Sequence, residues 1–152
     1  MEEAFLAGML HDVGKLTLMT VAAEKYSQVV ARVRQGEGLL FEVERKALGT
    51  THGEAGAYLL GLWGLHSAVI QAIGLHHRPF PTATAAPDLI TLVHAANVFE
   101  HQLVVINPNY HKPELNMEYL EAVGATGRLE NWREACVEMA QNGGVYVGGH
   151  PA

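Results

Sequence analysis

Hydrophobic side chains recur at intervals of three and four residues along most of this chain, which is the spacing of helices that bury one face. Residues 4–10 form such an apolar face and run directly into the pair His11-Asp12. The pattern predicts a second helix that begins at Thr20 or just after it, and the glycine-rich residues 36–38 are expected to end it.

Two further helices follow in the middle of the chain. Residues 40–48 form the first, and four of its charged side chains are expected to face solvent: Glu42, Glu44, Arg45 and Lys46. Thr51 with Glu54 three residues later forms a capping box, which predicts that a helix begins there. Three large apolar residues of that helix are expected to lie in the core: Leu59, Leu60 and Trp63.

The second half continues as helices separated by loops. Helices are predicted at residues 66–77, 88 to about 103, 117–123 and 129–141, with a loop at 79–87 that ends where Asp88 starts the next helix as its N-cap. Residues 142–152 are rich in glycine and are expected to form a flexible tail. Because neither alternating strands nor internal repeats occur, the fold class predicted is all-α, with one helical domain over residues 1–141.

Composition argues against several classes of function. The net charge is −6, which argues against a nucleic-acid or anionic-membrane surface. Cys136 is the only cysteine, so no internal disulfide can form, and the acidic start lacks the basic segment of a signal peptide. Residues 55–75 are apolar but contain four glycines and several polar residues, which favours two core helices over a membrane span. A cytoplasmic location is therefore expected.

Histidines and one aspartate form the candidate chemistry. Histidine is the commonest metal ligand, and three segments of this chain place histidines beside helix ends. Imidazoles combined with a carboxylate suit iron, manganese or zinc better than calcium. The candidates are His11, Asp12, His52, His76 and His77 as ligands, with Lys15 near enough to hold a phosphoryl oxygen. The alternative is a structural role, in which Asp12 caps a helix and pairs with Lys15.

A family resemblance rests on these residues. The run of residues 4–16, which contains His11-Asp12-Val13-Gly14-Lys15, resembles the His-Asp signature of the HD superfamily of metal-dependent phosphohydrolases. Residues 51–60, Trp63 and residues 76–79 are similar, more narrowly, to its HDOD branch, whose members often serve as output domains of bacterial response regulators. Residues 93–97, 118–124 and 128–133 fit the same branch. The resemblance covers about residues 1–135 and implies an HD-like helical bundle.

The resemblance also implies roles, and this chain departs from them in three places. It implies that the five candidate ligands hold metal, that Asp12 bridges if two metals bind, and that Lys15 steadies a phosphate. However, no histidine precedes His11, and Asn97 stands where active relatives have an aspartate ligand. The Gly-Tyr-Pro loop of the branch that hydrolyses cyclic di-GMP is also absent after His77. Asn97 completes the set of candidate metal-site residues.

Three functions stay open. The first is a signal-transduction output domain, catalytically degenerate, that acts through protein contacts and depends on an upstream receiver or sensor. The second is a metal-dependent phosphohydrolase, with Asp12 and Lys15 as its catalytic residues, that acts on a nucleotide or cyclic dinucleotide. The third is a domain that senses metal or nucleotide without turnover. Domains of this branch are longer, so we expect the N-terminal part to be missing and a homo-oligomer to bury four apolar residues: Phe5, Leu6, Met9 and Leu10.

Overall fold

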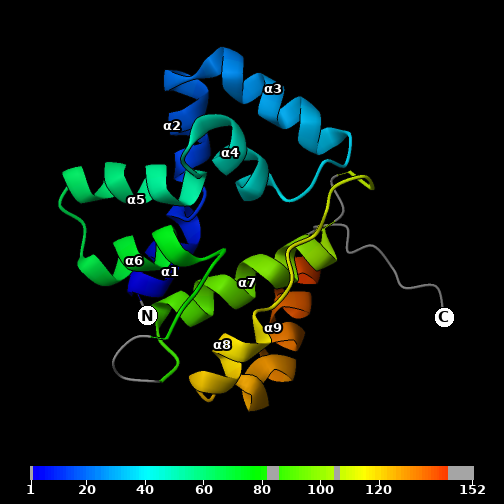
Figure 1. Cartoon of the computed structure of the whole chain (residues 1–152). Coiled ribbons are helices and arrows are strands. Elements are labelled where there is room, and N and C mark those ends of the chain that lie inside the picture. The colour runs from blue at the N-terminus through cyan, green and yellow to red at the C-terminus, as the bar shows by residue number, and fades with distance from the viewer. Residues whose placement is uncertain (1, 82–85, 105–106, 144–152) are drawn as a thin grey trace.

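The computed structural model describes residues 2–81, 86–104 and 107–143, and these residues form helices with no strand among them (Figure 1). The all-α class and the HD-like bundle are therefore confirmed. None of the described helices has the length and apolar character needed to cross a bilayer. In chain order the elements are α1 (Glu2–Leu10), α2 (Val13–Val21), α3 (Ala23–Arg34), α4 (Leu40–Leu48), α5 (His52–Leu62), α6 (Ser67–Leu75), α7 (Leu89–Leu103), α8 (Met117–Ala122), the short 3₁₀ helix η1 (Thr126–Arg128) and α9 (Leu129–Asn142).

The main hydrophobic core lies where α7 packs against α6 and α9 (Figure 1). Leu60 of α5, Ile73 of α6 and Leu120 of α8 are fully buried in it. Ala7 brings α1 into the same cluster. Burial of each large aliphatic side chain stabilises the fold by about 1.5–3 kcal/mol. This core holds the C-terminal ends of α1 and α6 close to each other and to the middle of α7.

A smaller core lies inside the hairpin formed by α3 and α4. Val29 and Val33 of α3 pack against Val43 of α4. The connection turns sharply because Gly36 and Gly38 adopt positive φ angles of 82° and 131°, which other residues rarely adopt. The hairpin thus forms a unit of its own beside the main core.

Helices α2 and α5 approach each other closely at two glycines. A Cβ atom on Gly14 would lie only 2.6 Å from the backbone nitrogen of Gly56, and it would meet the carbonyl group of His52 even closer. No side chain other than hydrogen fits at this crossing. The approach carries Asp12, the residue before α2, to the beginning of α5.

The apolar pattern did not predict helix α2, because the apolar residues of α2 do not form a continuous buried stripe. Leu16, Met19 and Val21 expose 64%, 54% and 74% of their surface, so the pattern carries little helical signal. Two predictions of side-chain exposure were also wrong. Trp63, expected in the core, is 64% exposed at the end of α5, and Glu44, expected in solvent, is fully buried.

Several helix boundaries agree closely with the sequence. The capping box of Thr51 and Glu54 is present at the start of α5, and Asp88 caps α7. Helix α4 spans the residues predicted for it. Phe5 and Met9 are exposed as expected, whereas Leu10 packs partly against the core. Helix α9 ends at the start of the predicted tail, of which residues 144–152 lie outside the described residues.

Candidate metal centre

The sequence candidates come from separate helix ends that meet in space. His11 and Asp12 form the joint between α1 and α2, and His52 is the first residue of α5. His76 and His77 directly follow α6. Asn97 lies in the middle of α7 and lines a cavity together with His76 and His77. The fold therefore gathers residues as far apart in the sequence as His11 and Asn97.

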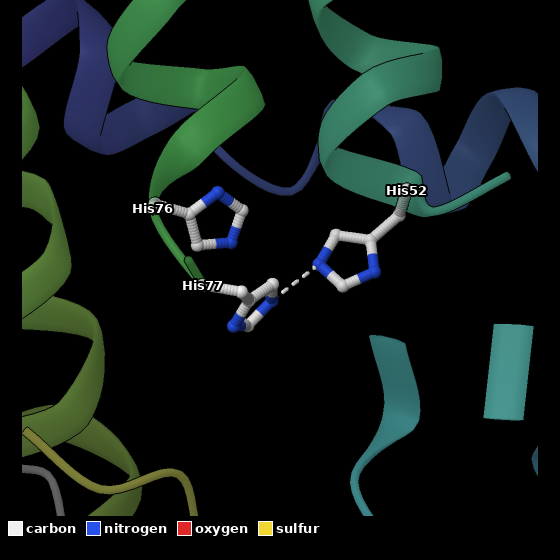
Figure 2. A group of neighbouring side chains, drawn as sticks. All are labelled: His52, His76 and His77. Atoms are coloured by element: carbon white, nitrogen blue, oxygen red, sulfur yellow. Dashed lines mark hydrogen bonds between the residues drawn. The ribbon is translucent and has the colours of Figure 1, made fainter. Parts of the chain in front are cut away.

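Three imidazole rings form the centre of the site. Figure 2 shows His76 and His77 at the end of α6, with His52 opposite them at the start of α5. The Nε2 atoms of His52 and His77 lie 2.8 Å apart. Each of the three residues offers a nitrogen within 4.8 Å of those of the other two. His52 and His76 are fully buried, and His77 is half-buried.

Asp12 connects this cluster to His11 and Lys15. Its Oδ1 atom lies 3.3 Å from His52 Nε2, and its Oδ2 atom lies 3.5 Å from His11 Nε2. Lys15 Nζ donates to the same Oδ2 at 2.6 Å. Burial alone would raise the pKa of Asp12, but the charge of Lys15 and the neighbouring histidines bring it below its ordinary value. Asp12 is therefore an ionised carboxylate beside the imidazoles.

Backbone and side-chain acceptors orient three of the rings in the same way. His11 Nδ1 lies 2.7 Å from Gly8 O, and His76 Nδ1 lies 2.6 Å from Ile73 O. His52 Nδ1 lies 2.7 Å from a carboxylate oxygen of Glu44. Because these oxygens only accept hydrogen bonds, each Nδ1 carries the proton and each Nε2 keeps its lone pair. This is the tautomer that a metal-binding histidine needs.

Several buried polar atoms at the site have no hydrogen-bond partner. Within the part of the chain that the structure describes, the complete set is Asp12 Oδ1, His76 Nε2, His77 Nδ1 and both amide atoms of Asn97. Unpaired buried polar atoms are costly and rare in folded proteins. All of them belong to residues that the sequence nominated for metal binding. A cation at this position would satisfy the three acceptors among them, namely Asp12 Oδ1, His76 Nε2 and the amide oxygen of Asn97.

The arrangement fits a divalent transition metal. Burial lowers the pKa of His76 to about 3 and also lowers that of His77, so both rings are neutral donors. Two ligands each about 2.0–2.2 Å from one ion would lie about 3–3.5 Å apart, depending on the angle between them. The separations of 2.8 Å and 3.3 Å around His52 Nε2 match this geometry. Imidazoles with one carboxylate suit iron, manganese or zinc.

The remaining histidines lie outside the cluster or are fully engaged. His94 is buried, but its Nδ1 donates to the carbonyl of His76 and its Nε2 accepts from the backbone N–H of Asn116. His66 is exposed and pairs with Glu3. His101 and His111 line a neighbouring cavity, and His150 lies outside the described residues.

Glu44 is the residue beside the cluster that the sequence analysis missed. It is fully buried in α4, and its carboxylate contacts both the backbone and the ring of His52. A signal for its burial was present, because Phe41, Glu44 and Leu48 follow one another at three- and four-residue spacing on one face of α4. The charge of Glu44 led to the opposite prediction.

A cavity of about 170 Å³ lies next to the cluster. His52 and His77 line it. Lys15, His101 and Lys112 also line it, together with apolar side chains of the α3–α4 hairpin. The cavity thus connects the candidate metal ligands with nitrogen-rich side chains able to bind an anion.

Comparison with known proteins assigns the family. The model of the HDOD domain matches residues 1–79. The matched segment contains five of the candidate metal ligands as well as Lys15 and Glu44, and it ends before Asn97. Searches of curated proteins and of solved structures gave no match. With more than half of its length matched, this chain belongs to the HDOD domain family.

Proposed function

We propose that this chain is a signal-transduction output domain that holds a divalent metal as part of its structure and acts through protein contacts, not through turnover. Membership of the HDOD family supports a signalling role. The observation that carries the metal proposal is the set of unpartnered buried atoms on Asp12, His76, His77 and Asn97. Together with His11 and His52 they form the proposed site.

Two features favour a degenerate centre over an active one. Asn97 supplies a neutral amide on α7, and an amide offers a cation no charge compensation. Lys15 is held by Asp12 at 2.6 Å, so its ammonium group is already paired. An active phosphohydrolase would need both positions to serve the substrate or the metal.

Exposed apolar side chains support a role in protein contacts. Phe5, Met9 and Leu16 expose 70%, 65% and 64% of their surface, and Trp63 exposes 64%. Large exposed apolar groups often mark interaction sites. We expect upstream receiver or sensor proteins, or a second copy of the chain, as partners. Light scattering at micromolar concentration tests the homo-oligomer, and a monomer would contradict it.

A metal-dependent phosphohydrolase is the second candidate, and the neighbouring cavity favours it. When bound, a divalent metal supplies a Lewis acid and lowers the pKa of a coordinated water. The cavity of about 170 Å³ opens beside His52 and His77, and Lys15 and Lys112 line its wall. Those two side chains would hold the negative charge of a phosphate ester.

A hydrolysis assay separates the two candidates. The wild-type protein and the Asp12→Ala variant are each incubated with bis(p-nitrophenyl) phosphate and with cyclic dinucleotides, in the presence of Mn²⁺ or Fe²⁺. The proposal predicts no turnover above that of Asp12→Ala. Turnover by the wild type that disappears in Asp12→Ala would instead establish the phosphohydrolase.

A further inference from the structure

Glu44 makes three hydrogen bonds in a site closed to solvent. Its Oε1 atom accepts from the hydroxyl of Tyr26 at 3.0 Å. Its Oε2 atom accepts from the backbone N–H of His52 at 2.8 Å and from Nδ1 of the same residue at 2.7 Å. Glu44 is fully buried, and the side chain of His52 is only 1% exposed. One carboxylate oxygen therefore fixes both the backbone and the ring of His52.

This arrangement determines which nitrogen of His52 is available. A carboxylate oxygen can only accept, so the proton of the ring stays on Nδ1. Nε2 then points its lone pair toward His77 Nε2 and Asp12 Oδ1, which lie 2.8 Å and 3.3 Å away. A negative charge on the far side of an imidazole also makes it a stronger donor to a cation.

A purely structural role explains these contacts less well. Moving a carboxylate into the interior carries a large desolvation cost before its hydrogen bonds are counted. A neutral amide could cap the start of α5 at a smaller cost, and Thr51 already provides a side-chain cap there. The charge of Glu44 is most useful if His52 must bind a cation.

We propose that Glu44 is a positioning residue of the metal centre, which holds His52 in its metal-binding tautomer and strengthens it as a ligand. The proposal rests on the metal binding proposed above. It also links the site to the α3–α4 hairpin, because Tyr26 lies on α3 and Glu44 on α4. Tyr26 donates to the carboxylate, and burial together with Glu44 raises the pKa of its hydroxyl.

Calorimetric titration with Zn²⁺ and with Mn²⁺ tests the proposal on the wild type and two variants. Glu44→Gln keeps the shape of the side chain and removes its charge. Glu42→Gln is the matched control, because Glu42 lies on the same helix and is more exposed than Glu44. Its carboxylate lies 3.7 Å from the guanidinium group of Arg78. Loss of an outer-shell partner weakens metal binding about 10- to 100-fold. We expect that loss in Glu44→Gln and wild-type affinity in Glu42→Gln.

A second measurement needs no variant. Nitrogen chemical shifts of His52 in the metal-free wild type report which ring nitrogen carries the proton, and we expect Nδ1. The opposite tautomer would overturn the role of Glu44 even if Glu44→Gln did not fold. Equal metal affinity in wild type and Glu44→Gln would also overturn it, while leaving the metal site intact. A wild type that binds neither ion would overturn both this inference and the proposed function.

Discussion

The Nε2 atoms of His52 and His77 lie 2.8 Å apart, although 25 residues separate them in the sequence. Glu44 holds the proton of His52 on Nδ1, so His52 presents a lone pair to its neighbour. The contact is therefore favourable only if a proton or a cation lies between the two rings. The ionised Asp12, at 3.3 Å from the same nitrogen, favours a cation there.

The crossing of α2 and α5 depends on Gly14. Gly14→Ala places a methyl group against the backbone of His52 and Gly56, which cannot move without separating the two helices. Overpacking of this kind costs typically 1–3 kcal/mol, and backbone contact on two sides puts the loss at about 3 kcal/mol or more. Urea unfolding followed by circular dichroism measures the change in free energy.

Gly8→Ala is the control for this substitution. Gly8 lies inside α1, and an added methyl group would meet nothing within 4 Å. A helical Gly→Ala change at an open position stabilises by about 0.5–1 kcal/mol. A Gly14→Ala protein as stable as Gly8→Ala would show that the helices do not cross as described.

The effect of Asn97→Asp on stability should be unfavourable without metal and favourable when metal is bound. Asn97 is only 4% exposed and its amide atoms have no partner, so a carboxylate there would be a buried charge. Without metal we expect a loss of at least about 1 kcal/mol. With Mn²⁺ or Zn²⁺ we expect binding at least about tenfold tighter than in wild type, which corresponds to about 1.4 kcal/mol.

Thermal unfolding with chelator and with added metal measures both effects of Asn97→Asp. Asn97→Leu is the comparison, because it removes the unpaired amide without adding a charge. The two variants should differ in their response to metal. An identical response would contradict a position for Asn97 beside the ion.

The pair of Glu100 and His101 predicts a pH-dependent contribution to stability. The hydrogen bond between the two side chains raises the pKa of His101 above its ordinary value of 6.5. The same bond lowers the pKa of Glu100 below its ordinary value of 4.5. The histidine contribution is fully present below pH 6.5 and is lost as the pH rises through the raised pKa. The glutamate contribution is present above pH 4.5 and is lost as the pH falls through the lowered pKa.

The free-energy difference between wild type and Glu100→Gln should therefore be largest between those two pH values and should shrink at pH 8. Both side chains are partly exposed, so solvent screening keeps the difference at a few tenths of a kcal/mol. Added salt should reduce it further. Urea unfolding at about pH 5.5 and pH 8 provides the measurement. A difference that is independent of pH would show that the pair does not form.

The sequence predicted most of the scaffold because local signals decide it. The capping residues Thr51 and Asp88 define helix starts through contacts with residues three positions away, and such contacts are visible in the sequence. The apolar pattern missed helix α2 because three of its large apolar side chains, Leu16, Met19 and Val21, are exposed. Trp63 was misplaced for a related reason, since hydrophobicity alone does not say which side of a helix end faces solvent.

The sequence predicted the candidate ligands by residue type, and the structure added the hydrogen-bond acceptors that orient them. The sequence nominated the histidines and Asp12, but not the acceptors that orient them. Gly8 O, Ile73 O and Glu44 Oε2 fix three ring tautomers, and two of these acceptors are backbone atoms that any residue provides. Glu44 could have been found from its register on α4, although its partner His52 lies on another helix.

The metal content of protein purified without chelator tests the central claim most directly. Elemental mass spectrometry compares the wild type with Asp12→Ala, His76→Ala and the control His66→Ala, whose histidine is exposed and outside the cluster. We predict near-stoichiometric iron, manganese or zinc in the wild type and in His66→Ala, and loss of metal in the other two variants. Metal-free wild type, or equal metal in all four folded proteins, would contradict the account.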